Sequence, residues 1–446
     1  MSSAGKAARV AIIGAGPAGL FVAKQLAEDG IEVALFNRDI KPGGLAEYGI
    51  YPAKTKIKDG LRSQFREILK TPGINYFGNT PIGKKFPLGL ADLKKMGFSA
   101  ILIAAGAQGT KWLGLPGENC AGVYHAKELV YHYNHLPPYA GQSFTIGKKV
   151  AVVGVGNVMT DIVRYLCTLP QVEEITTVAR RGLAEVKFDR HELEPIIGHL
   201  DWLDFQAEVE RIAPAMKAVG QEPNAHIQMI SERYQKTAEK SASPIWRLRF
   251  LSSPVKILCP ADGKVWCLRT EENELENIPG GVIAKGTGKF AELDVDTVIF
   301  AIGDRVDDEL GLPIKGYGFA LNNQPRFPMN GSSFELDENA KSEAGLEGVF
   351  VCGWSRIVSA GMVGIARKDG VNAARVIQKY LADQPETAPV QIEPLEMKLR
   401  TSGYTCVTLE DLNRLEVAEK KQAELMSQDQ FFFDSNEEML KSMGLV

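Results

Sequence analysis

The chain has 446 residues, of which 45% are hydrophobic and 24% charged, and its formal net charge is −4. This composition is ordinary for a globular protein, and the length is enough for two or three domains of about 150 residues each. The weakly acidic balance argues against a nucleic-acid partner, and no apolar run is long enough to span a bilayer. The N-terminus is short and polar, without an apolar signal core, so we expect a cytoplasmic location.

Six cysteines are spread along the chain, and no two of them have the C-x-x-C spacing of a redox dithiol, a structural zinc site or a cysteine-ligated cluster. We therefore expect six buried or half-buried thiols and no metal site. The six are Cys120, Cys167, Cys259, Cys267, Cys352 and Cys406.

The first motif is a strand, a glycine-rich turn, a helix and a second strand. β-Branched residues at 10–13 predict the first strand, GAGPAG at 14–19 the turn, residues 20–27 the helix and residues 32–36 the second strand. In this context a G-x-G-x-x-G turn is typical of a dinucleotide site, because the helix N-terminus presents unpaired N–H groups to a pyrophosphate. The alternative is a glycine-rich turn that binds no ligand.

Each glycine of this turn has a separate predicted task. Gly14 permits the tight turn, Gly16 lets the backbone approach a pyrophosphate, and Gly19 lets the helix pack closely on the strand. Pro17 and Ala18 lie between them and complete the predicted cofactor contact.

The end of the second strand lacks the acid that usually binds ribose hydroxyls in such a unit. Asn37 stands there, and its amide can still donate and accept hydrogen bonds to ribose. Arg38 follows, and a guanidinium would instead suit a 2′-phosphate. This unit alone therefore leaves the choice of dinucleotide open.

A second unit of the same kind follows in the middle of the chain. Residues 149–153 predict a strand, 154–161 a glycine-rich turn, 162–166 the opening of a helix and 175–179 the next strand. That strand ends in Arg180 and Arg181, with no acid. Because a guanidinium fork suits a phosphate monoester, this ending indicates NADP rather than NAD. The alternative is a solvated basic strand end.

The segment PGGLAEYGIYP at 42–52, together with the first unit, resembles the adrenodoxin-reductase-like family of flavoprotein ferredoxin–NADP reductases, and more distantly the small subunit of glutamate synthase. The resemblance implies that the first unit holds FAD and that Gly44, Leu45, Tyr48 and Gly49 run beside the flavin. The second unit matches the family's G-x-G-N-x-x-x-D and R-R-G patterns. The NADP-binding residues implied there are Gly154, Gly156, Asn157, Val158, Asp161, Arg180 and Arg181.

The resemblance also implies residues near the reacting atoms. Glu192, in an E-L pair, takes the place of a family glutamate near the nicotinamide, although a solvated carboxylate at a helix start is the alternative. Lys54 takes the place of a family histidine, and lysine cannot share imidazole's proton chemistry near neutral pH. Hydride transfer needs no acid or base, so we predict orienting or electrostatic roles for both side chains.

The resemblance implies further flavin contacts near the end of the chain. Residues 348–354 predict a strand that ends in Gly353 and Trp354, and the tryptophan is expected to pack along the isoalloxazine rather than in an ordinary core. Gly361, Met362 and Val363 take the place of a family backbone contact to the flavin pyrimidine, in a run that otherwise departs from the family pattern. The helix that begins near Gly364 would direct its positive end at the reduced flavin.

We therefore predict an α/β fold with two Rossmann-like nucleotide-binding domains. The FAD-binding domain is discontinuous, with a first part at 1–110 and a second part at 322–446 that ends in a helical tail. The NADP-binding domain, 111–321, is inserted between the two parts. The implied reaction is hydride transfer from NADPH to FAD and then single-electron transfer to a ferredoxin or another small iron–sulfur carrier.

Two alternatives remain open. One is a flavoprotein subunit of a larger glutamate-synthase-like or other iron–sulfur complex, and the other is a non-catalytic module that uses FAD structurally. The tail at 403–440 matches the family's C-terminus, whereas glutamate-synthase-type chains lack it and carry N-terminal cluster cysteines. The tail therefore favours the free-standing reductase.

An acidic ferredoxin would need a basic docking rim. In the family this rim lies largely on the NADP domain, but here one family arginine is replaced by Glu194. Basic residues are denser directly after the flavin-lining segment, so we predict a rim there, with a solvated helix face as the alternative. The rim would consist of Lys56, Lys58, Arg62 and Arg66.

Overall fold

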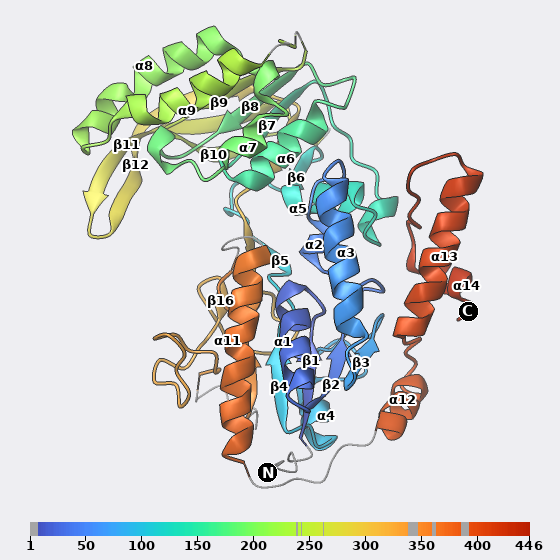
Figure 1. The fold of residues 1–446 in the computed structure, drawn as a ribbon. Coiled ribbons are helices and arrows are strands. Elements are labelled where there is room, and N and C mark those ends of the chain that lie inside the picture. The colour runs from blue at the N-terminus through green and yellow to red at the C-terminus, as the bar shows by residue number, and fades with distance from the viewer. Residues whose placement is uncertain are drawn as a thin grey trace. The chain divides into compact units, whose positions relative to one another are not determined.

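The computed structural model describes residues 8–237, 240–241, 243–261, 263–337, 347–358, 363–384 and 392–446. The chain forms two compact units, whose elements are labelled in Figure 1. Unit 1 consists of Met1–Thr110, Tyr131–Gly141 and Asp304–Val446, and unit 2 of Lys111–Val130 and Gln142–Gly303. None of the helices in the described ranges is long and apolar enough to cross a membrane.

Unit 1 is built on a five-stranded sheet whose strands are all parallel. Its strands are rich in β-branched and other apolar residues and are buried almost throughout, as expected for a parallel sheet covered on both faces. The order across the sheet is β17 (Val349–Val351), β4 (Ala100–Ile103), β1 (Arg9–Ile13), β2 (Glu32–Phe36) and β3 (Ile74–Phe77).

Two layers of apolar side chains cover this sheet. Val10 and Ile12 of β1 belong to one cluster, which also includes residues of α1, α3, α11 and α13, whereas Ala11 and Ile13 belong to the opposite one, with residues of α4 and α12. The alternation follows from the two-residue period of a strand. The helices are α1 (Pro17–Glu28), α3 (Thr55–Leu69), α4 (Leu90–Lys95), α11 (Val363–Ala382), α12 (Ile392–Thr401), α13 (Leu409–Leu425) and α14 (Asn436–Met443).

The tail begins as its sequence predicts. Thr408 caps α13 by accepting a hydrogen bond from the Asp411 backbone N–H, and the Asp411 carboxylate accepts one from the Thr408 N–H. This reciprocal pair is the capping box that T-x-x-D indicates. Val407 pairs with Gly78, so the tail starts beside the β3 edge of the sheet.

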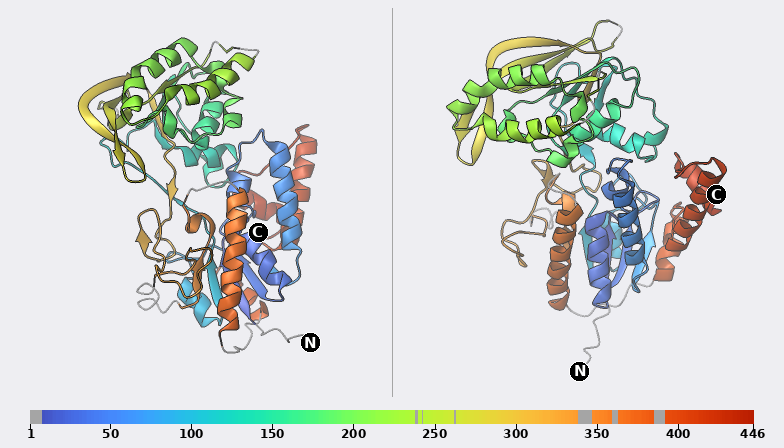
Figure 2. Two further views of the ribbon diagram at one scale, coloured as in Figure 1. Left: turned by 60° about the vertical axis from the view of Figure 1, so that its left-hand side comes forward. Right: turned by 45° about the horizontal axis from the view of Figure 1, so that its top comes forward.

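Unit 2 contains a second parallel five-stranded sheet and a three-stranded antiparallel sheet. In the parallel sheet the order is β6 (Val123–His125), β13 (Thr297–Phe300), β7 (Lys149–Val153), β8 (Glu174–Val178) and β9 (Ile245–Arg249). The antiparallel sheet consists of β10 (Ser252–Leu258), β11 (Cys267–Ile278) and β12 (Gly281–Asp294), and the hairpin of its two long strands stands out in Figure 2. The main helices are α6 (Asn157–Leu166), α8 (Trp202–Ala218) and α9 (Pro223–Lys236).

The insertion within a discontinuous domain agrees with the predicted fold, and the structure gives the return to unit 1 a different residue from the predicted 322. The chain re-enters unit 1 at Asp304, because β14 (Asp304–Arg305) pairs with β5 (Gly109–Thr110) of that unit. Tyr131–Gly141 also belongs to unit 1 rather than to the insert. Within this segment Asn134 accepts a hydrogen bond of 2.7 Å from the Lys58 ammonium of α3.

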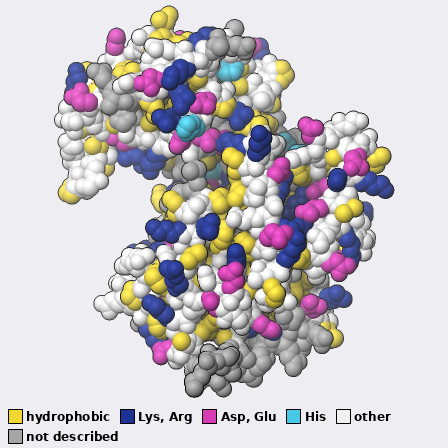
Figure 3. Space-filling view, viewed as in Figure 1, with side chains coloured by type: hydrophobic (Ala, Val, Ile, Leu, Met, Phe, Trp, Pro, Cys, Tyr) yellow, Lys and Arg dark blue, Asp and Glu magenta, His cyan; other side chains and the backbone are white. Residues whose placement is uncertain are grey.

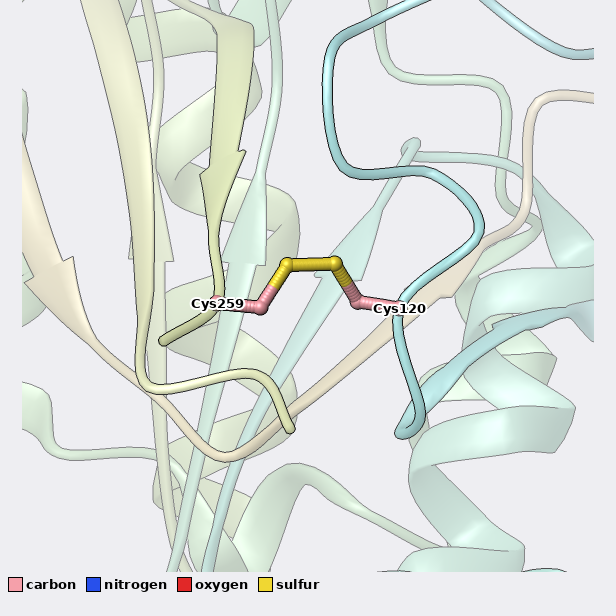
Figure 4. The surroundings of a disulfide bond; sticks show 2 residues. All are labelled: Cys120 and Cys259. Carbon is pink, nitrogen blue, oxygen red and sulfur yellow. A yellow bond between two sulfur atoms is a disulfide. The ribbon is translucent and has the colours of Figure 1, made fainter. Parts of the chain in front are cut away.

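The expectation of six free thiols is wrong for two of the cysteines. Cys120 and Cys259 form a disulfide within unit 2, with their Cα atoms 6.5 Å apart and a sequence separation of 139 (Figure 4). The loop before β6 lies along the end of β10, where the Ile257 N–H donates to the Pro116 carbonyl. Tertiary packing therefore creates this pair, which sequence spacing does not reveal. The remaining cysteines, Cys167, Cys267, Cys352 and Cys406, are free.

Candidate nucleotide-binding sites

The first glycine-rich turn, residues 14–19 of unit 1, connects β1 to α1. Gly14 has φ +108°, and a β carbon there would lie 2.4 Å from the Ala104 carbonyl oxygen of β4's end. A β carbon at Gly19 would lie 2.0 Å from the Gly14 carbonyl oxygen. A β carbon at Gly16 would meet no atom within 4 Å. Two glycines thus allow close packing, and the third faces open space at the start of α1.

The buried side chain of Asn37 supports this turn from the interior of unit 1. Its side-chain oxygen accepts a hydrogen bond of 3.1 Å from the Ala15 N–H, and its NH₂ donates to the carbonyls of Asp39 and Lys41. Asn37 is 6% exposed, so its amide braces the loop that follows β2. The ribose contact of Asn37 stays a prediction, and the structure adds this supporting role. Arg38 next to it is exposed and lies 3.2 Å from the Asp39 carboxylate.

The predicted flavin-lining segment packs directly on the first turn. Gly44 has φ +51°, and a β carbon there would lie 3.2 Å from the Gly16 Cα. Leu45–Tyr48 form one helical turn, α2, and Gly49 closes it with an N–H donated to the Leu45 carbonyl. Tyr48 is buried in an internal cluster with Tyr131, and burial raises the pKa of its hydroxyl. The backbone and Leu45, rather than the Tyr48 hydroxyl, are therefore the candidates for contact with a ligand.

The predicted basic rim on α3 is wrong, because its charges are used inside unit 1. Lys58 is 6% exposed, and burial lowers the pKa of its ammonium to about 8. Arg62 makes two hydrogen bonds of 2.7 Å to the buried Glu47 carboxylate. Burial opposes the charge on Glu47, but these bonds outweigh it and hold the pKa of the carboxyl below its usual value. Arg66 forms an ion pair with Glu416 of α13. Of the four residues of the predicted rim, only Lys56 has an exposed side chain.

The Gly353–Trp354 pair lies at the end of β17, next to the first turn. Gly353 has φ +61°, and a β carbon there would lie 2.7 Å from the Ala18 Cβ. Trp354 is half-buried, as a ring that covers a ligand requires. Asp369 of α11, which sequence reasoning missed, accepts a 2.6 Å hydrogen bond from the Gly353 N–H and pairs with Arg356. A carboxylate on the apolar face of a predicted helix is the signal that could have identified it.

The structure describes only part of the segment that is predicted to contact the flavin pyrimidine. Gly361 and Met362 lie outside the described residues, whereas Val363 is the first residue of α11. This helix packs closely on α1, since a β carbon at Gly370 would lie 2.6 Å from the Ala18 carbonyl oxygen. Arg367, in the second turn of α11, also contacts α1, with its guanidinium carbon 4.8 Å from the centre of the Phe21 ring.

The second glycine-rich turn, residues 154–157 of unit 2, has the same construction. Gly154 has φ +125°, and a β carbon there would lie 2.4 Å from the Ala301 carbonyl oxygen. Gly156 again faces open space, with no atom within 4 Å of an added β carbon. No side chain caps α6 at Gly156, so the helix start keeps its N–H groups for a ligand. Val158, 42% exposed, and the half-buried Asp161 are in the first two turns of α6.

Arg180 and Arg181 follow β8, the strand next to this turn. Arg180 is exposed and Arg181 half-buried, with one Arg181 nitrogen 3.4 Å from the Val282 carbonyl oxygen. Neither guanidinium forms an ion pair with a residue that the structure describes. Both positive charges are therefore left for an anion at this strand end.

Glu192 lies on the short helix α7 (Arg190–Leu193), which is held to the second turn. The Asn157 side-chain oxygen accepts a 2.8 Å hydrogen bond from the Asp189 N–H, and the Lys187 N–H donates to the Val155 carbonyl. Glu192 itself is half-buried. Of the residues predicted near the reacting atoms, Glu192 belongs to unit 2, while Lys54 and Trp354 belong to unit 1. Lys54 is half-buried at the N-terminal cap of α3.

His125 is a buried titratable group at the carboxyl end of β6. It is 2% exposed, its Nδ1 accepts a 3.2 Å hydrogen bond from the Lys127 N–H, and Trp112 contacts its ring edge-on. The Nε2 atom has no hydrogen-bond partner among the described residues. Burial, reinforced by the nearby charge of Lys127, lowers the pKa of the imidazole to about 4. His125 is therefore neutral at physiological pH.

We predict that this histidine makes unit 2 less stable in mild acid. The unfolded chain takes up the proton near pH 6.5, whereas the folded chain resists it down to about pH 4. Stability is therefore lost as the pH falls through this window, by up to about 3 kcal/mol. Thermal unfolding at about pH 7.5 and about pH 5 should show the loss in the wild type and a smaller one in His125→Asn. Equal losses in both proteins would contradict the prediction.

The described residues fit two dinucleotides, one in each unit. In both turns a glycine that faces open space stands before an uncapped helix start, which is the geometry that a pyrophosphate requires. Only the second turn is followed by two arginines without acidic partners. These features fit FAD in unit 1 and NADP in unit 2.

Comparison with known proteins agrees with this geometry. Residues 8–197 match the family model described as pyridine nucleotide-disulphide oxidoreductase. The chain is 29% identical over 410 residues to the NADPH-ferredoxin reductase FprA of Mycobacterium leprae, covering 85% of each chain. It is 24% identical over 453 residues to the mitochondrial NADPH:adrenodoxin oxidoreductase of Salvelinus fontinalis, covering 93% of this chain and 87% of that one.

Among solved structures, Mycobacterium tuberculosis FprA in complex with NADPH matches with a TM-score of 0.82. The sequence identity is 24%, and the match covers 98% of this chain and 99% of that one, which shows the fold. The resemblance that the motifs indicated is thus confirmed along nearly the whole chain: in sequence and fold, this protein is similar to the NADPH-ferredoxin and NADPH:adrenodoxin reductases.

Proposed function

We propose that the protein is an FAD-dependent NADPH oxidoreductase that passes electrons between NADP(H) and a ferredoxin-type iron–sulfur protein. The observation that carries this proposal is the pair of glycine-rich turns, each open at its second glycine, of which only the second is followed by unpaired arginines. The named activities of the relatives, NADPH-ferredoxin reductase and NADPH:adrenodoxin oxidoreductase, support the same reaction.

Each unit has its own task in this reaction. Unit 1 would hold FAD at Gly16 and the flavin-lining segment, and unit 2 would hold NADP at Gly156 and the two arginines. Bound FAD supplies a group that takes up two electrons together and releases them one at a time. We assign the outgoing electrons to an external carrier, in keeping with the ferredoxin and adrenodoxin in the names of the relatives.

The roles of Lys54, Glu192 and Trp354 belong to this proposal. Trp354 would cover the flavin, held there through the hydrogen bond from Gly353 to Asp369. Glu192 would orient the nicotinamide, because Asn157 connects its segment to the second turn. Lys54 would contribute charge near the flavin rather than a proton. A cytoplasmic location and membership in a larger redox complex stay predictions.

The test is an anaerobic titration of the purified yellow protein, first with NADPH and then with NADH. NADPH should bleach the flavin absorbance, and added [2Fe–2S] ferredoxin should then be reduced with return of the flavin colour. NADH should act only at much higher concentration. A flavin that NADPH does not bleach would refute the reductase and favour a structural use of FAD.

A further inference from the structure

Helix α11 of unit 1 has one buried and one exposed side. Ala366, Gly370, Ala373 and Ile377 are buried against α1 and the sheet. The exposed side carries Lys368, Arg375 and Lys379, which we call the α11 basic stripe. Their spacing of seven and then four residues places them on one face of the helix.

The charges of the α11 basic stripe are not neutralised within the described part of the chain. None of the three side chains forms an ion pair with a described residue. Asp369 is the only acid in the helix, and it is 5% exposed and committed to Arg356 and to the Gly353 N–H. This differs from α3, where Arg62 and Arg66 are paired with internal carboxylates. In a protein of net charge −4, the stripe is a local excess of positive charge.

The stripe starts near the end of unit 1 where the flavin is proposed to bind. Gly370 packs on Ala18 of the first turn, so α11 passes the first turn at this level, with Lys368 about half a turn before Gly370 and on the exposed side of the helix. The hairpin of β15 (Ile314–Lys315) and β16 (Gly318–Phe319) packs against the segment before α11, where a β carbon at Gly318 would lie 3.2 Å from Val358. On the face drawn in Figure 3, Lys and Arg side chains gather over the part of unit 1 that α11 covers.

We propose that the exposed face of α11 is the docking surface for an acidic iron–sulfur protein, which rests on the proposed function. Complementary charge raises the rate of encounter and orients the partner. A partner on the N-terminal part of this face would lie over the end of unit 1 where FAD is proposed to bind. Ile365, 50% exposed in the first turn of α11, adds an apolar contact at the N-terminal end of the stripe. The stripe is too poor in apolar side chains for a membrane-inserting helix.

The test compares two charge-reversed pairs in the full-length, FAD-loaded protein. Lys368→Glu with Arg375→Glu changes the stripe. Lys420→Glu with Lys421→Glu is the matched control on α13, where both lysines are exposed and form no ion pair with a described residue. The control helix lies by the β3 edge of the sheet, whereas α11 follows β17 at the other edge.

At low ionic strength, the stripe pair should reduce an acidic [2Fe–2S] ferredoxin about tenfold more slowly than the wild type. The difference in rate should shrink as salt is added, because salt screens the charges of the α11 basic stripe, with a Debye length of about 8 Å at physiological ionic strength. Reduction of menadione by NADPH should be unchanged, since this small neutral acceptor needs neither a docking surface nor charge steering. A Lys368→Gln, Arg375→Gln pair should give an intermediate rate, which separates charge from misfolding.

Two results would overturn the docking surface while leaving the function intact. One is a stripe pair that reduces ferredoxin at the wild-type rate, and the other is a control pair that is slowed equally. A wild-type protein that reduces menadione but no acidic ferredoxin would instead overturn the proposed function, and this surface with it.

Discussion

A Gly16→Val variant should fold normally and emerge colourless from purification. Gly16 has φ −74° and ψ 179°, an extended conformation that valine adopts readily, and its added β carbon meets nothing within 4 Å. The same open space faces the uncapped start of α1 and is where a pyrophosphate must lie. A branched side chain fills it, so FAD should be excluded without strain in the protein. Flavin absorbance per chain measures the loss of FAD. Comparison of the far-ultraviolet circular dichroism spectrum with that of the wild type shows whether the variant is folded.

The matched variant is Gly156→Val in unit 2. Gly156 is equally extended, at φ −111° and ψ −179°, and equally open. This variant should stay yellow but should no longer bind NADP⁺, which calorimetric titration can measure. Loss of FAD also removes the stabilisation that a ligand gives to the folded state, so only Gly16→Val should unfold earlier than the wild type. A folded, yellow Gly16→Val protein would mean that the flavin lies elsewhere.

Much of the fold was predictable because each nucleotide unit is encoded locally. The strands at 32–36 and 149–153 end where the sequence places them, since β-branched residues and a glycine-rich turn mark their limits. Other limits are less accurate: the run DVDTVIFAI at 294–302 predicts a strand of nine residues, but β13 is only Thr297–Phe300. Asp296 leaves the strand because its carboxylate accepts hydrogen bonds from the Lys148 and Lys149 N–H groups.

The sequence does not reveal side-chain partners that are remote along the chain. The place of Asn37 after β2 predicts a ribose contact, whereas its hydrogen bond to Ala15 is visible only in the fold. The charges of α3 were read as a surface rim because their partners, Glu47 and Glu416, come from other segments. Composition shows that a charge exists, whereas only the fold shows whether it is already paired. The same distinction now favours α11, whose Lys368 and Arg375 form no ion pair with a described residue.

An Arg180→Ala, Arg181→Ala double variant should lose most of its preference for NADPH over NADH. The two guanidinium groups follow β8 beside the second turn, and neither is neutralised by any residue in the described ranges. A charge-assisted hydrogen bond to the 2′-phosphate contributes about 1.5–3 kcal/mol, so the KM for NADPH should rise about tenfold to a hundredfold. NADH has no such phosphate, and its KM should hardly change.

The control for this last prediction removes the same amount of charge from another part of unit 2. Lys236→Ala with Lys256→Ala lies at the end of α9 and on β10, where both lysines are exposed and form no ion pair with a described residue. This pair should leave both KM values near those of the wild type, because a distant, exposed charge is screened by salt. Wild-type protein that uses NADH as well as NADPH would refute the assignment of Arg180 and Arg181. An equal rise of KM for both cofactors in the arginine variant would mean that the two side chains support the fold of the turn rather than bind the phosphate.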